Sequence, residues 1–239
     1  MNAVITGATR GVGRAIAAQL AADGYDLAVC ARNTEELGQL KTELERYGRT
    51  VHTFAADAAS KKELQAFADA VAQRFQTIDV VVNNVGVFFP GSLLDEADER
   101  FETQLQINLL AAYYMAKFFG NMMRNQRSGH LFTIGSVASK RPEPNAGSYS
   151  VTKAALLSLN DVLRQELAPY HVKVTAVLPG STYTSSWEGT TLPKAQFVQP
   201  EDIAQTISSV LRLSPGANVE EIVIRPLQFQ GDSGKKEEK

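Results

Sequence analysis

The stretch Thr6-Gly7-Ala8-Thr9-Arg10-Gly11-Val12-Gly13 decides the fold, because it joins a short apolar run to a helix-forming segment. Glycine serves where a backbone turns sharply and where it must approach a ligand without a Cβ atom. The N-terminus of the following helix offers unpaired N–H groups and partial positive charge to phosphates. A plain glycine-rich turn is the alternative, but the strand-loop-helix context favours a phosphate-binding loop. The spacing is Gly-x-x-x-Gly-x-Gly, which differs from the common dinucleotide fingerprint Gly-x-Gly-x-x-Gly.

Strand-forming and helix-forming segments alternate along the rest of the chain. Strands are predicted at 3–6, 25–31, 51–55, 78–82, 130–134, 172–178 and 221–225. Helices are predicted at 14–22, from 33 onward, and at 61–75, 98–124, 149–168 and 200–213. The strand segments are continuously apolar, which indicates burial on both faces between helices. The pattern predicts an α/β fold, a single Rossmann-like doubly wound parallel sheet of about seven strands flanked by helices.

Length and composition set limits on the class of protein. The 239 residues suit one domain, predicted over 1–230, followed by a polar and disordered tail over 231–239. A net charge of -2 gives no broad basic field for nucleic acid or membrane. The lone Cys30 cannot form an internal disulfide, and the sequence has no Cys/His cluster at metal spacing. No run reaches the about 18 apolar residues of a membrane span, and the opening residues do not resemble a signal peptide, so a cytoplasmic protein is expected.

The end of the second predicted strand indicates which dinucleotide the loop takes. An acid at this point would hold both ribose hydroxyls of NAD. Instead the strand ends in Arg32-Asn33, while Asp26 lies at its other end and Glu36 lies on the next helix, where it completes a capping box with Asn33. A guanidinium matches the oxygens of a 2′-phosphate, and Arg10 in the glycine loop could reach the same group. Solvated surface charge is the alternative for each arginine, but the pair without an acid favours NADP(H).

Tyr149 and Lys153 lie four residues apart, so on a helix they share one face. A phenol near pKa 10 exchanges protons poorly at neutral pH, and a nearby ammonium favours its phenolate form. Proton transfer catalysis benefits from such tuning. The spacing alone is weak, because a tyrosine and a lysine on a helix surface would show it too.

With these motifs the chain resembles the short-chain dehydrogenase/reductase family over nearly its whole length. The matching segments occur in family order and are residues 6–13, Asp57, Asn83-Asn84-Val85-Gly86, the set Asn108, Ser136, Tyr149 and Lys153, and Pro179-Gly180 with Thr184. The resemblance implies that the cofactor is bound by Gly7, Thr9, Arg10, Gly11, Val12, Gly13, Arg32, Asn33, Asp57, Asn84, Gly86, Tyr149, Lys153, Pro179, Gly180, Thr182 and Thr184. Val85 departs from the family's usual alanine.

The resemblance also implies catalytic roles. Ser136 would hydrogen-bond the substrate carbonyl, although alone it could be an ordinary serine at a strand end. Tyr149 would protonate the carbonyl oxygen in reduction or deprotonate the alcohol in oxidation. Lys153 would hold the nicotinamide ribose and tune Tyr149, and Asn108 would support a water relay behind Lys153.

These features predict an NADP(H)-dependent oxidoreductase that interconverts carbonyl and alcohol, with ketone reduction favoured in the cell. The substrate remains open among a small ketone or aldehyde, a 3-oxoacyl thioester and a pterin side-chain ketone. The chain end, residues 219–226, lacks the glycine-rich finish of many members and resembles the sepiapterin-reductase-like carbonyl reductases. A non-catalytic dinucleotide-binding sensor is the alternative of a different class, since fold does not fix function. The complete set of four catalytic residues speaks against a sensor.

Two further stretches carry expectations. Residues 107–116 are apolar almost all round and the helix from Tyr149 has a wide apolar surface, so a homodimer or homotetramer is expected, with burial inside one subunit as the alternative. The long connection 179–200 holds Tyr183, Trp187, Leu192 and Phe197. Together with Phe88 and Phe89 these side chains are expected to form an apolar lid and wall, unless they only pack the loop onto the body.

Overall fold

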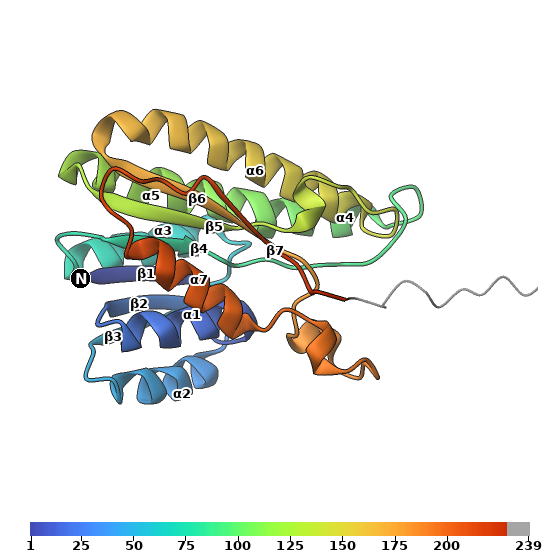
Figure 1. Cartoon of the computed structure of the whole chain (residues 1–239), viewed down its shortest axis with the longest axis horizontal. Helices are drawn as coiled ribbons and strands as arrows, with labels where there is room; N and C mark the ends of the chain where they lie inside the picture. Colours follow the sequence, from blue (N-terminus) through green and yellow to red (C-terminus); the bar gives the residue numbers. More distant parts are fainter. Residues whose placement is uncertain (229–239) are drawn as a thin grey trace, which may run out of the picture.

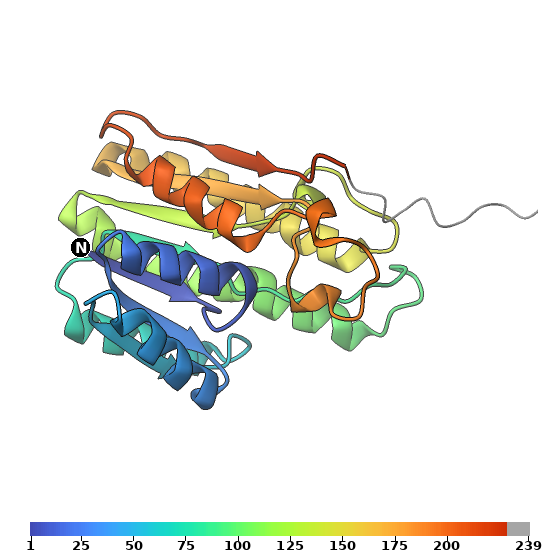
Figure 2. The same cartoon turned by 60° about the horizontal axis from the view of Figure 1, so that its bottom comes forward.

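The computed structural model describes residues 1–228, and their strands form one parallel sheet. The order across the sheet is β3-β2-β1-β4-β5-β6-β7, as Figures 1 and 2 show. The strands are β1 (Asn2–Thr6), β2 (Asp26–Ala31), β3 (Val51–Ala55), β4 (Val80–Asn83), β5 (Gly129–Ile134), β6 (Val172–Pro179) and β7 (Glu221–Ile224). The predicted doubly wound sheet of about seven strands is therefore confirmed. The predicted tail 231–239 and the predicted domain end at 230 lie outside the described residues.

Helices cover both faces of the sheet. The main helices are α1 (Gly11–Ala22), α2 (Thr34–Glu45), α3 (Lys61–Arg74), α4 (Asp98–Gln104), α5 (Ala111–Gln126), α6 (Gly147–Leu167) and α7 (Pro200–Leu211). One core packs α1, α2 and α7 on the sheet through side chains such as Ile16, Leu20 and Ile207. The other packs α3, α5 and α6 through side chains such as Phe67 and Phe119. Burial from both sides explains why the strand segments are continuously apolar.

The strand order reverses beside β1, and this point positions the site. β1 pairs with β2 through Thr6↔Cys30 and with β4 through Ile5↔Val82. The chain runs outward from β1 to β3, then returns across β1 and continues in the other direction from β4. In open α/β sheets, ligands bind outside the carboxyl ends of the strands at such a switch point. The glycine loop 6–13 and the turn after β4 both lie there.

The predicted helix 98–124 is helical throughout but is not one regular α-helix. α4 passes into a π-helical turn, Leu105–Leu110, and α5 follows. A π-turn accommodates an extra residue and occurs often at functional sites. Asn108 lies within it and is fully buried. A hydrophobic pattern taken over the whole stretch does not show one additional residue, so the sequence does not predict the turn.

The connection 179–200 is folded into short 3-10 turns rather than left open. These turns are Ser185–Trp187 and Lys194–Gln196. A bridge between Thr182 and Val198 closes the base of the segment. A second bridge, Gly91↔Ala146, joins the loop after β4 to the loop before α6. Both loop regions stand at the carboxyl edge of the sheet (Figure 2).

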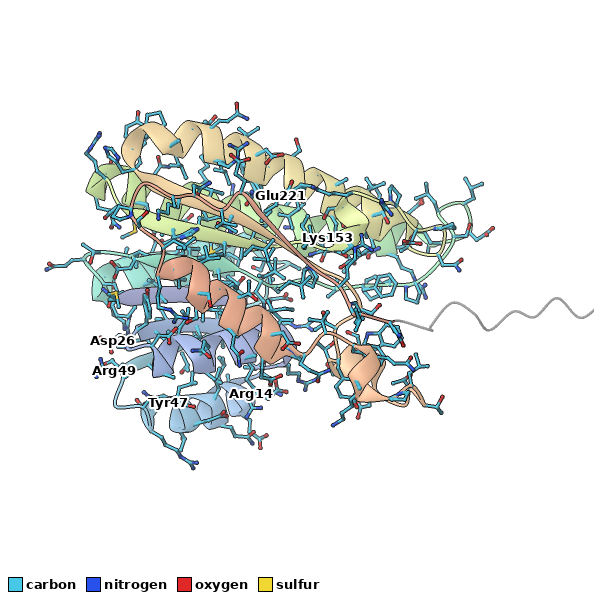
Figure 3. The ribbon with its side chains drawn as sticks, in the orientation of Figure 1. Arg14, Asp26, Tyr47, Arg49, Lys153 and Glu221 are labelled. Carbon is cyan, nitrogen blue, oxygen red and sulfur yellow. The ribbon has the colours of Figure 1, made fainter. Side chains whose placement is uncertain are left out.

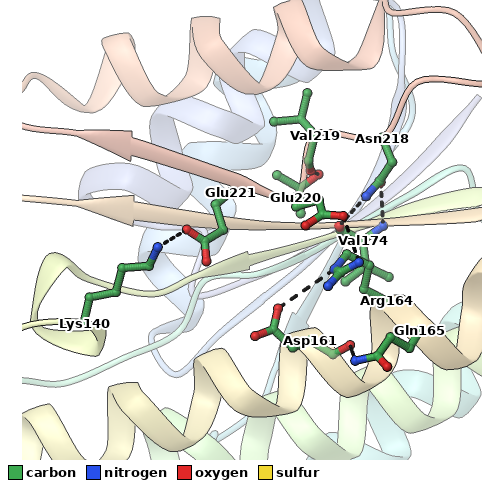
Figure 4. Close-up of polar contacts among 10 residues, drawn as sticks. Lys140, Asp161, Arg164, Gln165, Val174, Asn218, Val219, Glu220 and Glu221 are labelled. Carbon is green, nitrogen blue, oxygen red and sulfur yellow. Dashed lines mark hydrogen bonds and ion pairs between the residues drawn. The ribbon is translucent and has the colours of Figure 1, made fainter.

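Ion pairs attach the last strand to its surroundings. Arg164 on α6 binds Glu220 at 2.8 Å and lies 3.9 Å from Asp161 (Figure 4). Lys140, after β5, pairs with Glu221 at the start of β7. Exposed pairs of this kind contribute little individually. The placement of β7 therefore rests mainly on its ladder with β6.

Candidate active site

The glycine loop adopts a backbone that only glycine fits well. Gly7 and Gly11 have φ angles of +67° and +52°, in the left-handed region. A Cβ atom on Gly13 would lie 2.2 Å from the Gly7 carbonyl oxygen and 2.4 Å from Asn84 Nδ2. The start of α1 thus lies directly against the loop that precedes it. The helix N-terminus faces the space above the loop, as a phosphate-binding site requires.

A cavity of about 490 Å³ lies over this loop. It is lined by twelve of the predicted cofactor residues, namely Gly7, Thr9, Arg10, Gly11, Val12, Gly13, Arg32, Asn33, Asp57, Asn84, Gly86 and Thr184. Tyr149, Lys153, Pro179, Gly180 and Thr182 do not line it. Its position over the glycine loop at the N-terminus of α1, with Arg10 and Arg32 in its lining, fits the adenosine and phosphate part of a dinucleotide.

Asn84 holds the two central strands together at the cavity floor. Its Nδ2 donates to the carbonyl oxygens of Thr6 and Gly7 at 2.9 and 3.0 Å. The Thr6 hydroxyl accepts from the N–H groups of Asn84 and Val85 at 3.1 and 3.2 Å. Asn84 therefore lines the cavity, but its amide group positions the loop rather than pointing freely at a ligand. Val85 packs closely beside Gly7, on which a Cβ atom would lie 3.1 Å from the Val85 Cα.

The two arginines differ in their surroundings. Arg32 is exposed at the cavity edge, and no partner for it is found within residues 1–228. Arg10 binds Glu36, with its Nε 3.1 and 3.0 Å from the two carboxylate oxygens. The predicted capping box is therefore wrong in one half. Asn33 does cap α2 by accepting from the N–H groups of Glu35 and Glu36, but the Glu36 carboxylate reaches across to the glycine loop instead of back to Asn33.

Tyr149, Ser136 and Lys153 meet at the carboxyl ends of β5 and β6. The Ser136 hydroxyl lies close enough to the Tyr149 phenol to lower the phenol's pKa by side-chain hydrogen bonding. It also accepts from the Ala138 N–H at 3.1 Å, so its own proton is free to be donated. Lys153 extends from α6 (labelled in Figure 3). Its Nζ lies 5.7 Å from the Tyr149 ring centre and donates to the Ile134 carbonyl oxygen at 3.0 Å.

Asn108 fixes the turn that follows β4. Its Oδ1 accepts from the Val87 N–H at 2.7 Å, and its Nδ2 donates to the Val87 carbonyl oxygen at 3.0 Å. Nδ2 also lies 3.2 Å from Thr152 Oγ1 on α6. A Cβ atom on Gly86 would lie 3.3 Å from both Asn108 Oδ1 and Lys153 Nζ. Asn108 is thus adjacent to Lys153 and acts as a positioning residue; the water relay stays a prediction.

Burial shifts the pKa values of both titratable groups. It raises the pKa of Tyr149, and the hydrogen bond from Ser136 opposes this shift. Burial lowers the pKa of Lys153 to about 8, so that its ammonium loses a proton more readily than a solvated lysine. The phenol therefore remains protonated at neutral pH in the free protein. It is held as an acid beside a serine donor and a buried ammonium.

Sequence reasoning missed several residues of the site. Leu64, Ile107 and Ser185 line the cavity, and no motif identifies them because ordinary core or loop residues look the same. Glu36 also lines it, although its position on a helix favoured a cap. Phe88 is part of the predicted wall. Its ring lies 5.0 Å from that of Tyr149 at an edge-to-face angle and is 46% exposed, so an apolar surface does adjoin the phenol.

The aromatic residues of the connection 179–200 pack mainly on one another. Trp187 and Tyr183 lie 4.8 and 5.6 Å from Phe197, measured between ring centres. Phe197 itself is buried. Thr184 reaches the cofactor side, where a Cβ atom on Gly11 would lie 3.0 Å from its Cγ2. The segment therefore closes over the glycine loop at Thr184, while its aromatic cluster is anchored to the body.

Two classes of site are not found in the described part of the chain. Within residues 1–228, no group of three or more histidine, cysteine or acidic side chains could hold a metal ion. No helix of the same residues has the length and apolarity needed to cross a membrane. Cys30 is buried, and burial raises the pKa of its thiol to about 12, as is typical of a structural rather than a reactive cysteine.

The fold and the site together define a Rossmann-type α/β protein with a serine-tyrosine-lysine centre beside a dinucleotide cleft. The family model for short chain dehydrogenases matches residues 1–194, and the chain belongs to this family. An uncharacterized oxidoreductase of Staphylococcus epidermidis is 30% identical over 225 residues, which cover 94% of this chain and 96% of that protein.

Solved structures agree with this assignment. An alcohol dehydrogenase from the archaeon Thermococcus sibiricus, complexed with 5-hydroxy-NADP, is 32% identical with a TM-score of 0.89. The alignment covers 95% of this chain and 96% of that one. A metagenomic short-chain oxidoreductase in complex with NADP is 29% identical with a TM-score of 0.83, over 95% and 96% of the two chains.

Proposed function

We propose that this protein is an NADP(H)-dependent oxidoreductase that interconverts a carbonyl group and an alcohol, with ketone reduction as its cellular direction. The observation that carries the proposal is the Ser136-Tyr149-Lys153 centre. In it a half-buried tyrosine has the Ser136 hydroxyl as a neighbour that lowers its pKa, and the buried Lys153 Nζ lies 5.7 Å from its ring centre. This centre adjoins the dinucleotide cleft, because Lys153 Nζ bonds the carbonyl oxygen at the end of β5 and lies beside Gly86, which lines the cleft. A binding module would not need a buried ammonium under a phenol, because burying a charge is costly.

Each of the three side chains has a separate role in the proposed reduction of a carbonyl group. The Ser136 hydroxyl and the Tyr149 phenol both donate to the carbonyl oxygen, and the phenol proton passes to that oxygen as negative charge develops on it. The Lys153 ammonium stabilises the resulting phenolate. The bound dinucleotide supplies the hydride to the carbonyl carbon. One proton from solvent then restores the phenol, and oxidation of an alcohol is the reverse sequence.

The cofactor choice is supported by charge at the edge of the cleft. Arg32 follows β2 where an acid would hold an unphosphorylated ribose, and its guanidinium is exposed toward the cavity. Two similar structures carry NADP or an NADP derivative. The three glycines and the N-terminus of α1 serve the pyrophosphate, which both cofactors share.

Arg32→Ala is expected to weaken NADPH binding by about 10- to 100-fold and to leave NADH binding nearly unchanged, because only NADPH has the 2′-phosphate. Dissociation constants from calorimetry or from nucleotide fluorescence check this. Arg46→Ala, at the far end of α2, is the control. Equal or tighter binding of NADH by the wild-type protein would contradict the NADP(H) preference.

A substrate panel tests the reaction itself. NADPH oxidation is measured with diketones, acetoacetyl thioesters, pterins and sugars, which separate a general ketone reductase from a 3-oxoacyl thioester reductase and a pterin carbonyl reductase. Turnover with any carbonyl, abolished by loss of the Tyr149 hydroxyl, is the expected result. Tight NADPH binding without oxidation across the whole panel would favour the alternative of a dinucleotide-binding sensor.

The wall beside the phenol favours apolar substrates. Phe88→Ala is expected to raise the KM for aromatic or extended ketones by about 10-fold, since it removes most of a large apolar contact surface at Tyr149. Leu94→Ala is the matched control, because Leu94 is 93% exposed on the same loop. Trp187→Ala tests whether the connection 179–200 forms a lid over the substrate. If it does, this substitution should change the KM. Unchanged KM values in both aromatic variants would place the substrate pocket elsewhere.

A homodimer or homotetramer is proposed through α5 and α6. Some of the apolar side chains expected to need a partner are buried within the subunit, Ile107 and Leu156 among them, whereas others, such as Leu109 and Leu157, are only partly buried. Tyr113, Val151 and Val162 remain 39%, 49% and 47% exposed. Light scattering is expected to give two or four times the monomer mass, and Val162→Glu should lower it while Leu213→Glu, just beyond α7, should not. A monomer at micromolar concentration would refute the proposal.

A further inference from the structure

Glu36 occupies the donors that the cofactor's ribose end would need. It is the third residue of α2, where an acid ordinarily reaches back to the N-cap. Here its carboxylate binds the Arg10 guanidinium through Nε and Nη2. Arg10 and, after it, Thr9 lower the pKa of the Glu36 carboxyl group. Arg10 and Thr9 are both lining residues of the dinucleotide cleft, as is Glu36 itself. One of the predicted cofactor contacts, Arg10, is therefore already bound to a carboxylate, and a second, Thr9, lies near it.

The net positive charge at the ribose end of the cleft is smaller than the presence of Arg10 and Arg32 suggests. Arg10 and Arg32 bring two positive charges, and Glu36 removes one of them. A 2′-phosphate carries close to two negative charges, so it would be repelled by the carboxylate that shares its guanidinium. The Arg10 side chain is 68% exposed and that of Glu36 is 21% exposed, so Arg10 is the more mobile partner. Only the Nη1 edge of Arg10 is left for a phosphate while the pair persists.

We propose that Glu36 is a specificity-determining residue that limits the preference for NADPH and allows NADH to bind in the same cleft. In NAD-binding Rossmann sites, a carboxylate accepts hydrogen bonds from the ribose hydroxyls. Glu36 is the acid of this cleft that stands beside Arg10 and Thr9, and it can take that role when the ribose bears no phosphate. NADPH binding instead draws Arg10 away from Glu36. The inference rests on the proposed NADP(H) function.

The same two helices provide a matched control. Arg14 on α1 binds Glu43 on α2 at 2.5 Å, one turn along α1 from Arg10 (Figure 3 labels Arg14). This pair has similar chemistry and joins the same helices, but neither residue lines the dinucleotide cleft. Glu43→Gln therefore reports the effect of losing an α1–α2 ion pair alone. Glu36→Gln removes the charge at the cleft and retains an amide oxygen that can still accept from Arg10 and Thr9.

Calorimetry on the full-length protein tests the inference without relying on turnover. Four probes are used: NADPH, NADH, adenosine 2′,5′-bisphosphate and AMP. Glu36→Gln is expected to tighten NADPH and the bisphosphate by about 3- to 10-fold, as removal of one nearby like charge predicts, and to weaken NADH. The NADPH-to-NADH affinity ratio should rise by about 10-fold or more. Glu43→Gln should leave all four dissociation constants unchanged, and thermal melting checks that both variants are folded.

The outcomes separate this inference from the proposed function. If Glu36→Gln weakens NADPH or leaves the ratio unchanged, Glu36 only anchors Arg10 and the inference is wrong, while the proposed function stands. If Glu43→Gln shifts the ratio equally, the effect comes from helix packing and the inference is also wrong. If the wild-type protein binds neither NADPH nor NADH, the proposed function itself fails.

Discussion

Replacing Tyr149 with phenylalanine should lower turnover by about 10²- to 10⁴-fold, the range that a positioned general acid contributes. The substitution removes the hydroxyl whose pKa Ser136 lowers and keeps the ring, so the edge-to-face contact with Phe88 remains. The dissociation constant of NADPH should change by less than about threefold, because the Tyr149 ring does not line the cleft at the glycine loop. Steady-state rates with the best carbonyl of the panel, together with calorimetry, measure both quantities.

Tyr113→Phe serves as the control for this experiment, since Tyr113 is a partly exposed tyrosine on α5 away from the centre. Its turnover should equal that of the wild-type protein. A Tyr149→Phe variant with near wild-type turnover would show that another group donates the proton. Loss of NADPH binding together with turnover would instead give Tyr149 a role in holding the cofactor.

Gly13→Ala should be the most damaging conservative substitution in the cleft. The added methyl group would lie 2.2 Å from a backbone oxygen and 2.4 Å from the Asn84 amide, and backbone on one side cannot move aside cheaply. Forcing α1 away from the loop should cost about 1–3 kcal/mol of stability, the usual range for an overpacked site. It also displaces the helix N-terminus that faces the phosphates. Urea unfolding and NADPH calorimetry should show lower stability and at least about 100-fold weaker binding.

Gly38→Ala provides the comparison. Gly38 lies inside α2 with nothing within 4 Å of the position of a new Cβ atom. Alanine there should stabilise the protein by about 0.5–1 kcal/mol, because glycine is a poor helix residue. NADPH binding should not change. If the Gly13→Ala variant has the same stability to urea and the same affinity for NADPH as the wild-type protein, the close approach of α1 to the loop is not essential.

The alternation of apolar strands with helices was enough to predict the sheet, because burial on both faces leaves a simple signal. The strand-end positions followed from it within about two residues. The π-turn at Leu105–Leu110 could not be predicted, since its extra residue leaves composition and local polarity unchanged. The short 3-10 turns of the connection 179–200 were likewise missed, because each depends on one or two backbone bonds.

The identities of the site residues were easier to predict from the sequence than their hydrogen-bond and ion-pair partners. The spacing of Tyr149 and Lys153 was weak alone, and the ordered family motifs were needed to predict the centre with Ser136. The structure places the Ser136 hydroxyl near the Tyr149 phenol. The sequence does not indicate which donors already have a partner. Glu36 has the spacing of a helix cap, and only tertiary placement directs it to Arg10 instead. Long-range pairing of this kind leaves no periodic signal.

The π-turn between α4 and α5 changes the direction in which the side chains beyond it point around the helix axis. Each α-helical residue advances a side chain by about 100°, and an inserted residue resets that angle for everything beyond it. Gln104, just before the turn, and Asn108, within it, both reach the segment after β4. Their side-chain oxygens accept from the N–H groups of Phe89 and Val87 at 3.3 and 2.7 Å. Point substitutions cannot undo such an offset, whereas deletion of a single residue could rotate α4 against α5. The number of residues from α4 to α5 therefore constrains this segment as strictly as its amino-acid composition does.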